Sequence, residues 1–459
     1  MLRADPAYDR SGEVVVRLKR RIIIVGAAIS ALLVNQAHAQ NMSMLRDAEI
    51  ESDLLAYETP VVRAAGLDPS AMHIFLINDM DLNSFVAGGQ NIFMNVGTIM
   101  RAETPNQLIG IMAHETGHIA GGHIARSEDA MRKAMYEGMM AMAIGIAMAA
   151  VSGGAGGAAL LGASGVAERA WLQFSVEQEA RADQAALTFL DRTHQSAKGL
   201  LEFFEILQQQ EFMNGQREVP YLRTHPLTEQ RIEYVREHVN NSPYKDNADP
   251  PQFITMLSRM KAKLAGFLQD PQTTLNQYPE TDQSLTARYA RAIAYYRIPD
   301  LGHALPAIDS LIHDYPSDPY FIELKGQMLF ENGRIAEAVE PYRKATQLDP
   351  SSMLLRTELA QAEIESENPK YLANARAQLE EVTRNEVQNA EAWRLLAIVY
   401  GRTNNMGMAS LALAEQGASS GDHDMARHEA MRAAKLLPAG PAHQRALDIA
   451  DEAKREKDK

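Results

Sequence analysis

The chain has 459 residues, of which 46% are hydrophobic, so it can form a packed core and is long enough for two or three domains. Its formal net charge is −14, which argues against nucleic-acid binding because that function needs a basic surface. There is no cysteine, so disulfides cannot stabilise the fold and any zinc site must use histidine and carboxylate ligands.

The first 39 residues have the organisation of a cleavable signal peptide. Lys19, Arg20 and Arg21 precede the uncharged run 22–34, and an A-x-A site follows at 37–39. These are the basic, apolar and cleavage regions of a secretory signal. The alternative is a short membrane anchor, but the run is shorter than the roughly 20 residues that span a bilayer. We therefore predict export, with cleavage after Ala39.

Residues 40–250 are predicted to form an α+β domain with a small sheet. A helix is expected over 45–66. Three short strands are expected at His73–Ile77, Ser84–Ala87 and Asn91–Val96, with Gly88 and Gly89 forming a turn between the last two. Thr104 and Pro105 then suit the N-cap and first position of a helix that runs to about Ile119.

Residues 138–167 contain no charged side chain. Three interpretations remain open: a flap over the active site, a hairpin in peripheral contact with a membrane, and a buried helical hairpin. The second half is interrupted by glycines, so a full membrane span is the weakest interpretation. Helical patterns resume over 170–190 and 197–212.

The polar stretch 240–251 marks the best domain boundary. A bridging helical segment is predicted over 251–284, with its main helix from about Gln252 to Leu268. Residues 285–459 then repeat with a period of about 34, as tetratricopeptide repeats do. The clearest unit places small and large residues at the expected positions: Gly326, Leu329, Ala338, Tyr342, Ala345 and Pro350. The expected fold class is therefore mostly α, a zincin-like α+β domain followed by an α-solenoid, whose repeats stack because each hairpin cannot bury its apolar face alone.

The helix predicted from Pro105 contains the pattern HExxH at His114, Glu115 and His118. Residues four apart lie on one side of a helix, so both imidazoles can bind one metal ion. Glu115 is then placed to act as general base. Zinc is the expected ion because it tolerates a four-coordinate site with one open position. The alternative is a solvated helix face with two ordinary histidines.

The metal site needs a third ligand, and two downstream positions are candidates. The metzincin spacing would require histidine at position 124, which is Ile124. On a continued helix the nearby His123 would point away from His114, which predicts a structural histidine. Glu179 and Asp183 are four apart on a later helix, so Glu179 can supply the third ligand while Asp183 accepts a hydrogen bond from a ligating histidine. The alternative is an exposed acidic face.

The motifs HETGH (114–118), QEARAD (178–183) and THPLTEQRI (224–232) resemble those of the gluzincin peptidases, which include the CAAX prenyl proteases, the heat-shock protease HtpX and the periplasmic BepA-type proteases. The repeats are similar to the BepA branch specifically. The resemblance implies one zinc per chain on His114, His118 and Glu179, with Glu115 as base. It also implies a role in outer-membrane protein assembly and quality control.

The same resemblance singles out His225, which can occupy the fourth zinc position in BepA-like proteins and hold the enzyme latent. Two alternatives remain: donation of a hydrogen bond to the tetrahedral oxyanion, and capping of the helix that Pro226 begins. Arg231 matches the arginine of the motif, either as a substrate contact or as a structural ion pair. The strands at 83–87 and 90–94 are candidates for binding an extended substrate by strand addition.

We therefore expect a periplasmic zinc endopeptidase that is soluble or peripheral on a membrane and degrades or trims misassembled envelope proteins, with repeats that recruit them. The predicted partners are unfolded or misassembled envelope proteins and the outer-membrane β-barrel assembly machinery. The alternative is an assembly chaperone or scaffold that acts through the repeats while its peptidase is mostly silent.

Overall fold

The computed structural model describes residues 43–123, 175–214, 221–222 and 225–457. The predicted signal peptide and the uncharged segment 138–167 lie outside these residues.

A four-stranded mixed sheet begins the described part of the chain, with strand order β1-β2-β4-β3. Strand β2 pairs with β4 in parallel and β3 pairs with β4 antiparallel. Alternation of side chains places one face in the core, and the rings of Phe75, Phe93 and Phe85 stack across the other. The strand bounds are β1 Met44–Leu45, β2 His73–Ile77, β3 Ser84–Val86 and β4 Asn91–Asn95. The predicted strands therefore form, to within one residue at their ends.

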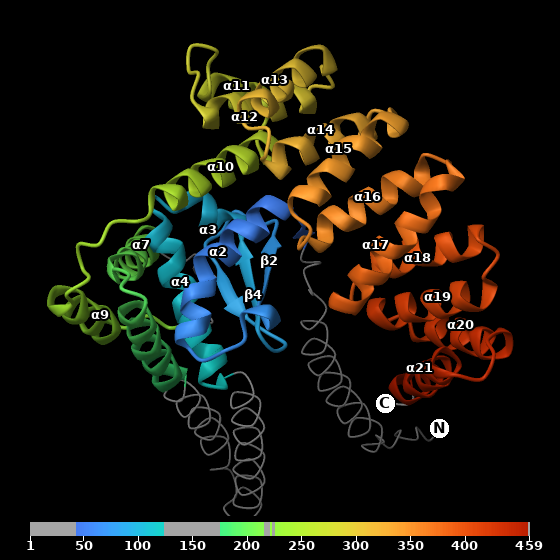
Figure 1. The fold of residues 1–459 in the computed structure, drawn as a ribbon. Helices are drawn as coiled ribbons and strands as arrows, with labels where there is room; N and C mark the ends of the chain where they lie inside the picture. The colour runs from blue at the N-terminus through green and yellow to red at the C-terminus, as the bar shows by residue number, and fades with distance from the viewer. Residues whose placement is uncertain (1–42, 124–174, 215–220, 223–224, 458–459) are drawn as a thin grey trace, which may run out of the picture. The chain divides into compact units, whose positions relative to one another are not determined.

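Helices α2 and α4 pack against this sheet and against each other (Figure 1). Helix α4 starts where the sequence predicts, because the Thr104 side chain accepts a hydrogen bond from the backbone N–H of Gln107 and Pro105 takes the first position. It ends at Ala120, with Gly121 as its C-cap. The helices of this region are α2 Ala48–Ala64, η1 Pro69–Ala71, α3 Val96–Arg101, α4 Pro105–Ala120, the described helix 175–192, α7 Lys198–Asn214 and α9 Glu229–Asn241.

Helix α10, Pro251–Leu268, contacts both α2 and the first repeat helix, α12. Helices α11 to α21 follow, drawn from yellow to red in Figure 1, and each packs against the next helix in the chain. Their bounds are α11 Pro271–Gln277, α12 Leu285–Arg297, α13 Leu301–Asp314, α14 Pro319–Glu331, α15 Ile335–Leu348, α16 Met353–Glu365, η2 Pro369–Tyr371, α17 Leu372–Asn385, α18 Ala390–Arg402, α19 Met406–Ser420, α20 His423–Leu436 and α21 Pro441–Lys457. The predicted fold class is confirmed, and the hairpin α20–α21 adds a helical pair that the repeat pattern did not identify.

A set of buried and partly buried polar side chains connects α2, α10 and the first repeats. We call it the joint cluster, and its members are Asp47, Glu49, Arg259, Lys263, Tyr289 and Asp318. Glu49 accepts hydrogen bonds from Arg259 at 2.6 Å and from the Tyr289 hydroxyl at 2.7 Å. Lys263 lies 2.8 Å from Asp47 and 3.3 Å from Glu49. The contact between the sheet region and the repeats is therefore built from paired charges as well as apolar packing.

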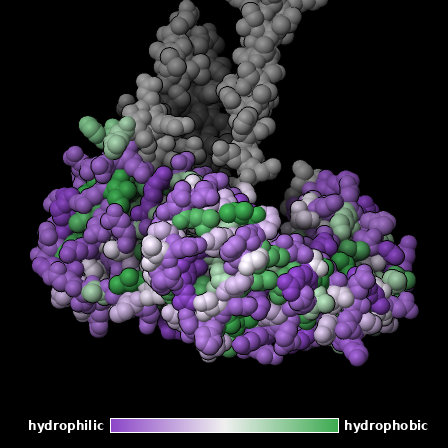
Figure 2. Space-filling view, turned by 90° about the horizontal axis from the view of Figure 1, so that it is seen from above, coloured by the Kyte–Doolittle hydropathy of each residue, from purple (hydrophilic) through white to green (hydrophobic). Residues whose placement is uncertain are grey.

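The face in Figure 2 is mostly hydrophilic, and its hydrophobic residues occur in small separate groups. In the described part of the chain, every helix is too short or too polar to cross a bilayer.

Candidate active site

Four side chains that are distant in sequence meet in the interior: His114, His118, Glu179 and His225. One potential ligand atom from each lies within 4.8 Å of all the others, and all four residues are buried. The Nε2 atoms of His114 and His118 are 3.1 Å apart, and each lies 3.3 Å from one oxygen of Glu179. His225 brings its Nδ1 to 3.2 Å from Glu179. Their atoms thus surround one point at which a single cation fits.

The Glu179 carboxylate supplies negative charge to this cluster. Burial alone would raise the pKa of Glu179, but the neighbouring His225, His114 and His118 hold it well below its usual value. Burial lowers the pKa of His118 to about 3, although Glu179 acts in the opposite direction, so His118 is neutral and can donate a lone pair. Two imidazoles and a carboxylate form a donor set of the type that zinc prefers.

His114 contacts Asp183, the acid that the sequence analysis pairs with a ligating histidine. Its Nδ1 lies 2.9 Å from Asp183 Oδ1, which leaves Nε2 facing the cluster. Burial alone would lower the pKa of His114, but Asp183 and Glu179 raise it to about 10. The two acids therefore favour a positive charge at this imidazole, and a metal cation on its Nε2 would satisfy the same preference.

Arg231 forms ion pairs inside the site. Its guanidinium donates to Asp183 at 2.6 and 2.9 Å and lies 3.0 Å from Glu179. A fourth contact, 2.7 Å long, goes to the carbonyl of Pro226, beside His225. Of the two roles left open for Arg231, the geometry is that of the structural ion pair, and it links the acids of the site to the loop that carries His225.

Glu115 is fully buried next to the cluster, yet neither of its carboxylate oxygens has a hydrogen-bond partner among the described residues. Burial raises its pKa, while His225 and His114 oppose the shift. The Nε2 atom of His225 lies 3.7 Å from Glu115 and likewise has no hydrogen-bond partner among the described residues. Unpaired buried polar atoms are costly in a native protein, so these atoms fit a site that receives water, substrate and a metal ion.

The helix 175–192 approaches α4 very closely at Gly117. A Cβ atom at Gly117 would lie 2.7 Å from the carbonyl oxygen of Ala182. The glycine within the HExxH motif therefore permits the contact that brings Glu179 and Asp183 to His114.

His225 is held from two sides. Its backbone N–H donates to the carbonyl of Tyr221 at 2.8 Å, and its ring stacks on the Tyr221 ring at 4.5 Å between centroids. The contact from Arg231 to Pro226 fixes the following residue. Residues 223–224 lie outside the described part of the chain.

His123 lies in contact with the cluster without belonging to it. The direction that His123 would take on a continued helix does not apply, because α4 ends at Ala120, next to the predicted end at Ile119, and Gly122 has a φ of 61°. The chain turns back and brings His123 Nδ1 to 3.1 Å from His118 Nδ1. Two consecutive glycines are a recognisable helix-end signal, so this turn could have been predicted from sequence.

Two parts of this chain are similar to known protein families. The sequence profile of peptidase family M48 matches residues 45–239, and a tetratricopeptide-repeat profile matches residues 286–352. The chain carries a peptidase family M48 domain followed by tetratricopeptide repeats. The predicted resemblance is confirmed, and the family supports a metalloprotease.

Several known proteins are similar to this chain. A beta-barrel assembly-enhancing protease from Escherichia coli (strain K12) is 26% identical over 381 residues, which are 82% of this chain and 77% of the relative. Metalloprotease LoiP of the same organism is 27% identical, over 35% of this chain and 60% of the relative. Among solved structures, the tetratricopeptide-repeat protein YrrB covers 38% of this chain and 89% of its own at 19% identity, with a TM-score of 0.32.

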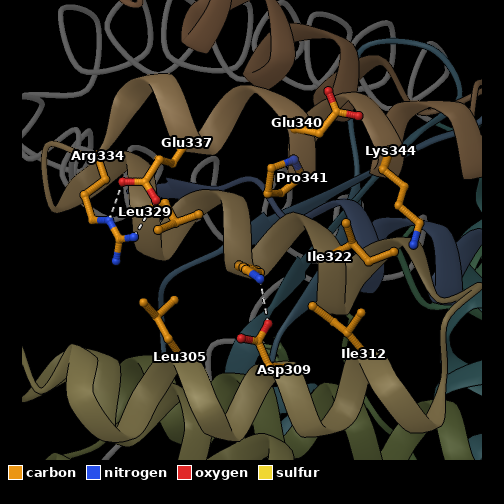
Figure 3. Close-up of a pocket in the computed structure, with 11 residues that line it drawn as sticks. Leu305, Asp309, Ile312, Ile322, Leu329, Arg334, Glu337, Glu340, Pro341 and Lys344 are labelled. Carbon is orange, nitrogen blue, oxygen red and sulfur yellow. Dashed lines mark hydrogen bonds and ion pairs between the residues drawn. The ribbon is translucent and has the colours of Figure 1, made fainter.

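The repeats behind the M48 domain contain a groove between α13, α14 and α15, with a volume of about 450 Å³ (Figure 3). Lys325 stands immediately before Gly326, where the repeat pattern W-x₂-L-G has leucine. Its amine lies 2.7 Å from Asp309 on the facing helix, while Ile312 and Ile322 line the same groove. A polar pair thus replaces apolar packing at this position.

Proposed function

We propose that this protein is a zinc endopeptidase exported to the periplasm, where it degrades misassembled outer-membrane proteins and assists their assembly. The observation that carries the proposal is the convergence of His114, His118 and Glu179 beside Glu115, whose two buried carboxylate oxygens have no hydrogen-bond partner among the described residues. The name of the Escherichia coli relative, beta-barrel assembly-enhancing protease, supports the substrate class.

The residues of the chain would divide the hydrolysis between them. His114, His118 and Glu179 would hold one zinc ion, and zinc when bound supplies Lewis-acid activation of water and of the scissile carbonyl. Glu115 would accept the proton of the attacking water on a carboxylate oxygen and pass it to the leaving amine. Asp183, which forms an ion pair with Arg231, would accept a hydrogen bond from His114 Nδ1 and so keep the tautomer whose Nε2 is free to bind the metal.

Substrate would bind as an additional strand on β3, which is the last strand in the order β1-β2-β4-β3 and packs against α4. A free strand edge offers unpaired backbone groups to an extended peptide. The sequence-based candidates for this role, 83–87 and 90–94, include β3 and its neighbour β4, and the edge position favours the first.

His225 would act as a gate. Its Nδ1 lies with the three metal-binding candidates, and its Nε2 lies 3.7 Å from Glu115, in the region that attacking water would need. In this position the imidazole competes with water and holds the peptidase latent. Release of the contacts from Tyr221 and Arg231 would free it, and the displaced ring could then donate to the oxyanion.

A second candidate function, an assembly chaperone or scaffold, is supported by the repeats. Five helical pairs follow the M48 domain, and stacked repeats form extended surfaces for partner proteins. In this function the repeats hold an envelope protein or the β-barrel assembly machinery. Peripheral membrane contact through 138–167 remains a separate expectation. If Glu115→Gln still supports assembly of the partner in cells, the scaffold function is independent of cleavage.

The test of the enzymatic proposal compares the wild type with Glu115→Gln and His225→Ala. Zinc content and cleavage of casein are measured on the purified mature protein. We expect one zinc per chain in all three, low wild-type cleavage, higher cleavage in His225→Ala, and a loss of at least about 100-fold in Glu115→Gln because the general base is removed. Wild-type activity retained in Glu115→Gln would contradict the assignment, as would the absence of bound metal. Lower activity in His225→Ala would make this residue an oxyanion donor instead of a gate.

A further inference from the structure

His118 presents its two ring nitrogens to different surroundings. Nε2 faces the cluster, 3.1 Å from His114 Nε2 and 3.3 Å from Glu179. Nδ1 is on the other side of the ring, 3.1 Å from His123 Nδ1. His123 is therefore next to the nitrogen that a cluster-bound metal would not use, and it is absent from the group of potential ligands.

The contact between His118 and His123 has the geometry of a hydrogen bond. The two rings are nearly perpendicular, with an interplanar angle of 82° and centroids 5.0 Å apart. His123 is 4% exposed, so bulk water does not substitute for it at this position. If His118 Nε2 gives its lone pair to a metal, its Nδ1 carries the hydrogen and His123 Nδ1 has to accept it.

The backbone after α4 is shaped to allow this contact. A Cβ atom on Gly121 would lie 2.3 Å from His123 Nε2, so any side chain there would displace the ring. Gly122 has a φ of 61°, in the left-handed region that glycine adopts without strain. The two glycines thus turn the chain sharply and leave space for His123 beneath the end of the HExxH helix.

We propose that His123 is a positioning residue for the metal centre, which fixes the tautomer and orientation of His118 as Asp183 does for His114. The inference rests on the proposed zinc peptidase function. The acceptor for His118 is then an uncharged imidazole, whereas the acceptor for His114 is a carboxylate at 2.9 Å. Hydrogen-bond partners of this kind typically contribute about 10–100-fold to metal affinity.

Two variants separate hydrogen bonding from packing. His123→Phe retains a flat ring but has no acceptor, whereas His123→Asn loses the ring and can place its amide oxygen near the position of Nδ1. The measurements are the zinc dissociation constant, by competition with a chelating indicator, and the visible absorption spectrum of the cobalt-substituted protein. His303→Phe is the matched control, because His303 is exposed and its partner is Asp300.

We expect His123→Phe to weaken zinc binding about 10–100-fold and to alter the cobalt spectrum, while His123→Asn stays within a few-fold of the wild type. Unchanged affinity in His123→Phe would overturn the proposal. Equal losses in both variants, together with a lower urea midpoint of the metal-free protein, would also overturn it, because that pattern indicates packing. A wild-type protein that binds no zinc would instead refute the peptidase proposal, so the two failures are distinguishable.

Discussion

Two buried clusters of charged side chains in this chain differ in how completely their polar atoms are paired. In the joint cluster, both oxygens of Glu49 accept hydrogen bonds or ion pairs, and Lys263 contacts two carboxylates. In the candidate active site, both oxygens of Glu115 and the Nε2 of His225 have no hydrogen-bond partner within the described part of the chain, and the two groups approach each other only to 3.7 Å. Burial of charge is common to both clusters, so burial alone does not identify a functional site.

Unpaired atoms make the difference because their cost has to be offset by a ligand or by the rest of the fold. The joint cluster already satisfies its own groups, and its charges therefore stabilise a contact between α2, α10 and the repeats. The candidate active site leaves acceptors free beside an acidic centre, which suits water, metal and substrate. The comparison assigns stability to the first cluster and chemistry to the second, and each assignment can be tested separately.

Removing Lys263 should have the largest effect on stability. Lys263→Met removes the ammonium group that lies 2.8 Å from Asp47. It also removes one of the two cations that contact Glu49, so that only Arg259 remains there. Loss of one partner from a buried pair costs about 3–5 kcal/mol. We expect the urea midpoint to fall strongly while the folded protein keeps its zinc affinity.

Lys325→Met is the matched control, since Lys325 pairs with Asp309 and both side chains are partly exposed. An exposed pair contributes about 0–1 kcal/mol. Equal losses of stability in the two lysine variants would contradict the role assigned to the joint cluster.

An alanine at Gly117 should have an intermediate effect on stability and a large effect on the metal site. Its Cβ would lie 2.7 Å from the Ala182 carbonyl and would push away the helix that carries Glu179. Overpacking of this kind costs about 1–3 kcal/mol, and displacement of a ligand should weaken zinc binding. Chelator competition and urea unfolding measure the two effects.

Gly401 provides the control for that substitution, because a Cβ there meets nothing within 4 Å and the residue lies inside α18. Gly401→Ala should be neutral or slightly stabilising. Wild-type zinc affinity in Gly117→Ala would show that the close helix contact is not needed to position Glu179.

The sequence predicted those features that local patterns encode. Strands β2 and β4 follow apolar alternation, α4 follows its Thr-Pro start, and the repeats follow their period. The convergence of Glu179 on the HExxH motif was expected from residue chemistry and family resemblance. The joint cluster was not predicted, because the pairing of Glu49 with Lys263 joins distant helices and has no local signal. The contact of His123 with His118 was not predicted, because the direction of His123 was considered only on a continued helix, whereas the two glycines after α4 turn the chain back.

Asp53 offers the most specific test, because its carboxyl group, beside the joint cluster, makes the free energy of unfolding depend on pH. Burial raises the pKa of Asp53 to about 8, and Glu49 adds to the shift while Arg259 and Lys263 oppose it. The folded protein then keeps a proton that the unfolded chain releases near pH 4. Between these values the unfolded state binds fewer protons, so the free energy of unfolding falls as pH rises and levels off above the folded pKa.

Asp53→Asn should remove this contribution, since the amide has nearly the same shape and does not titrate. Its stability relative to the wild type should therefore rise between pH 5.5 and 7.5, by about 2.5 kcal/mol. Other buried carboxyls such as Glu323, whose pKa burial raises to about 7, titrate in both proteins and cancel in the difference. Urea unfolding at the two pH values measures the change. A difference that is constant with pH would mean that Asp53 is charged in the folded protein, paired with Arg259 and Lys263, and belongs to the satisfied cluster.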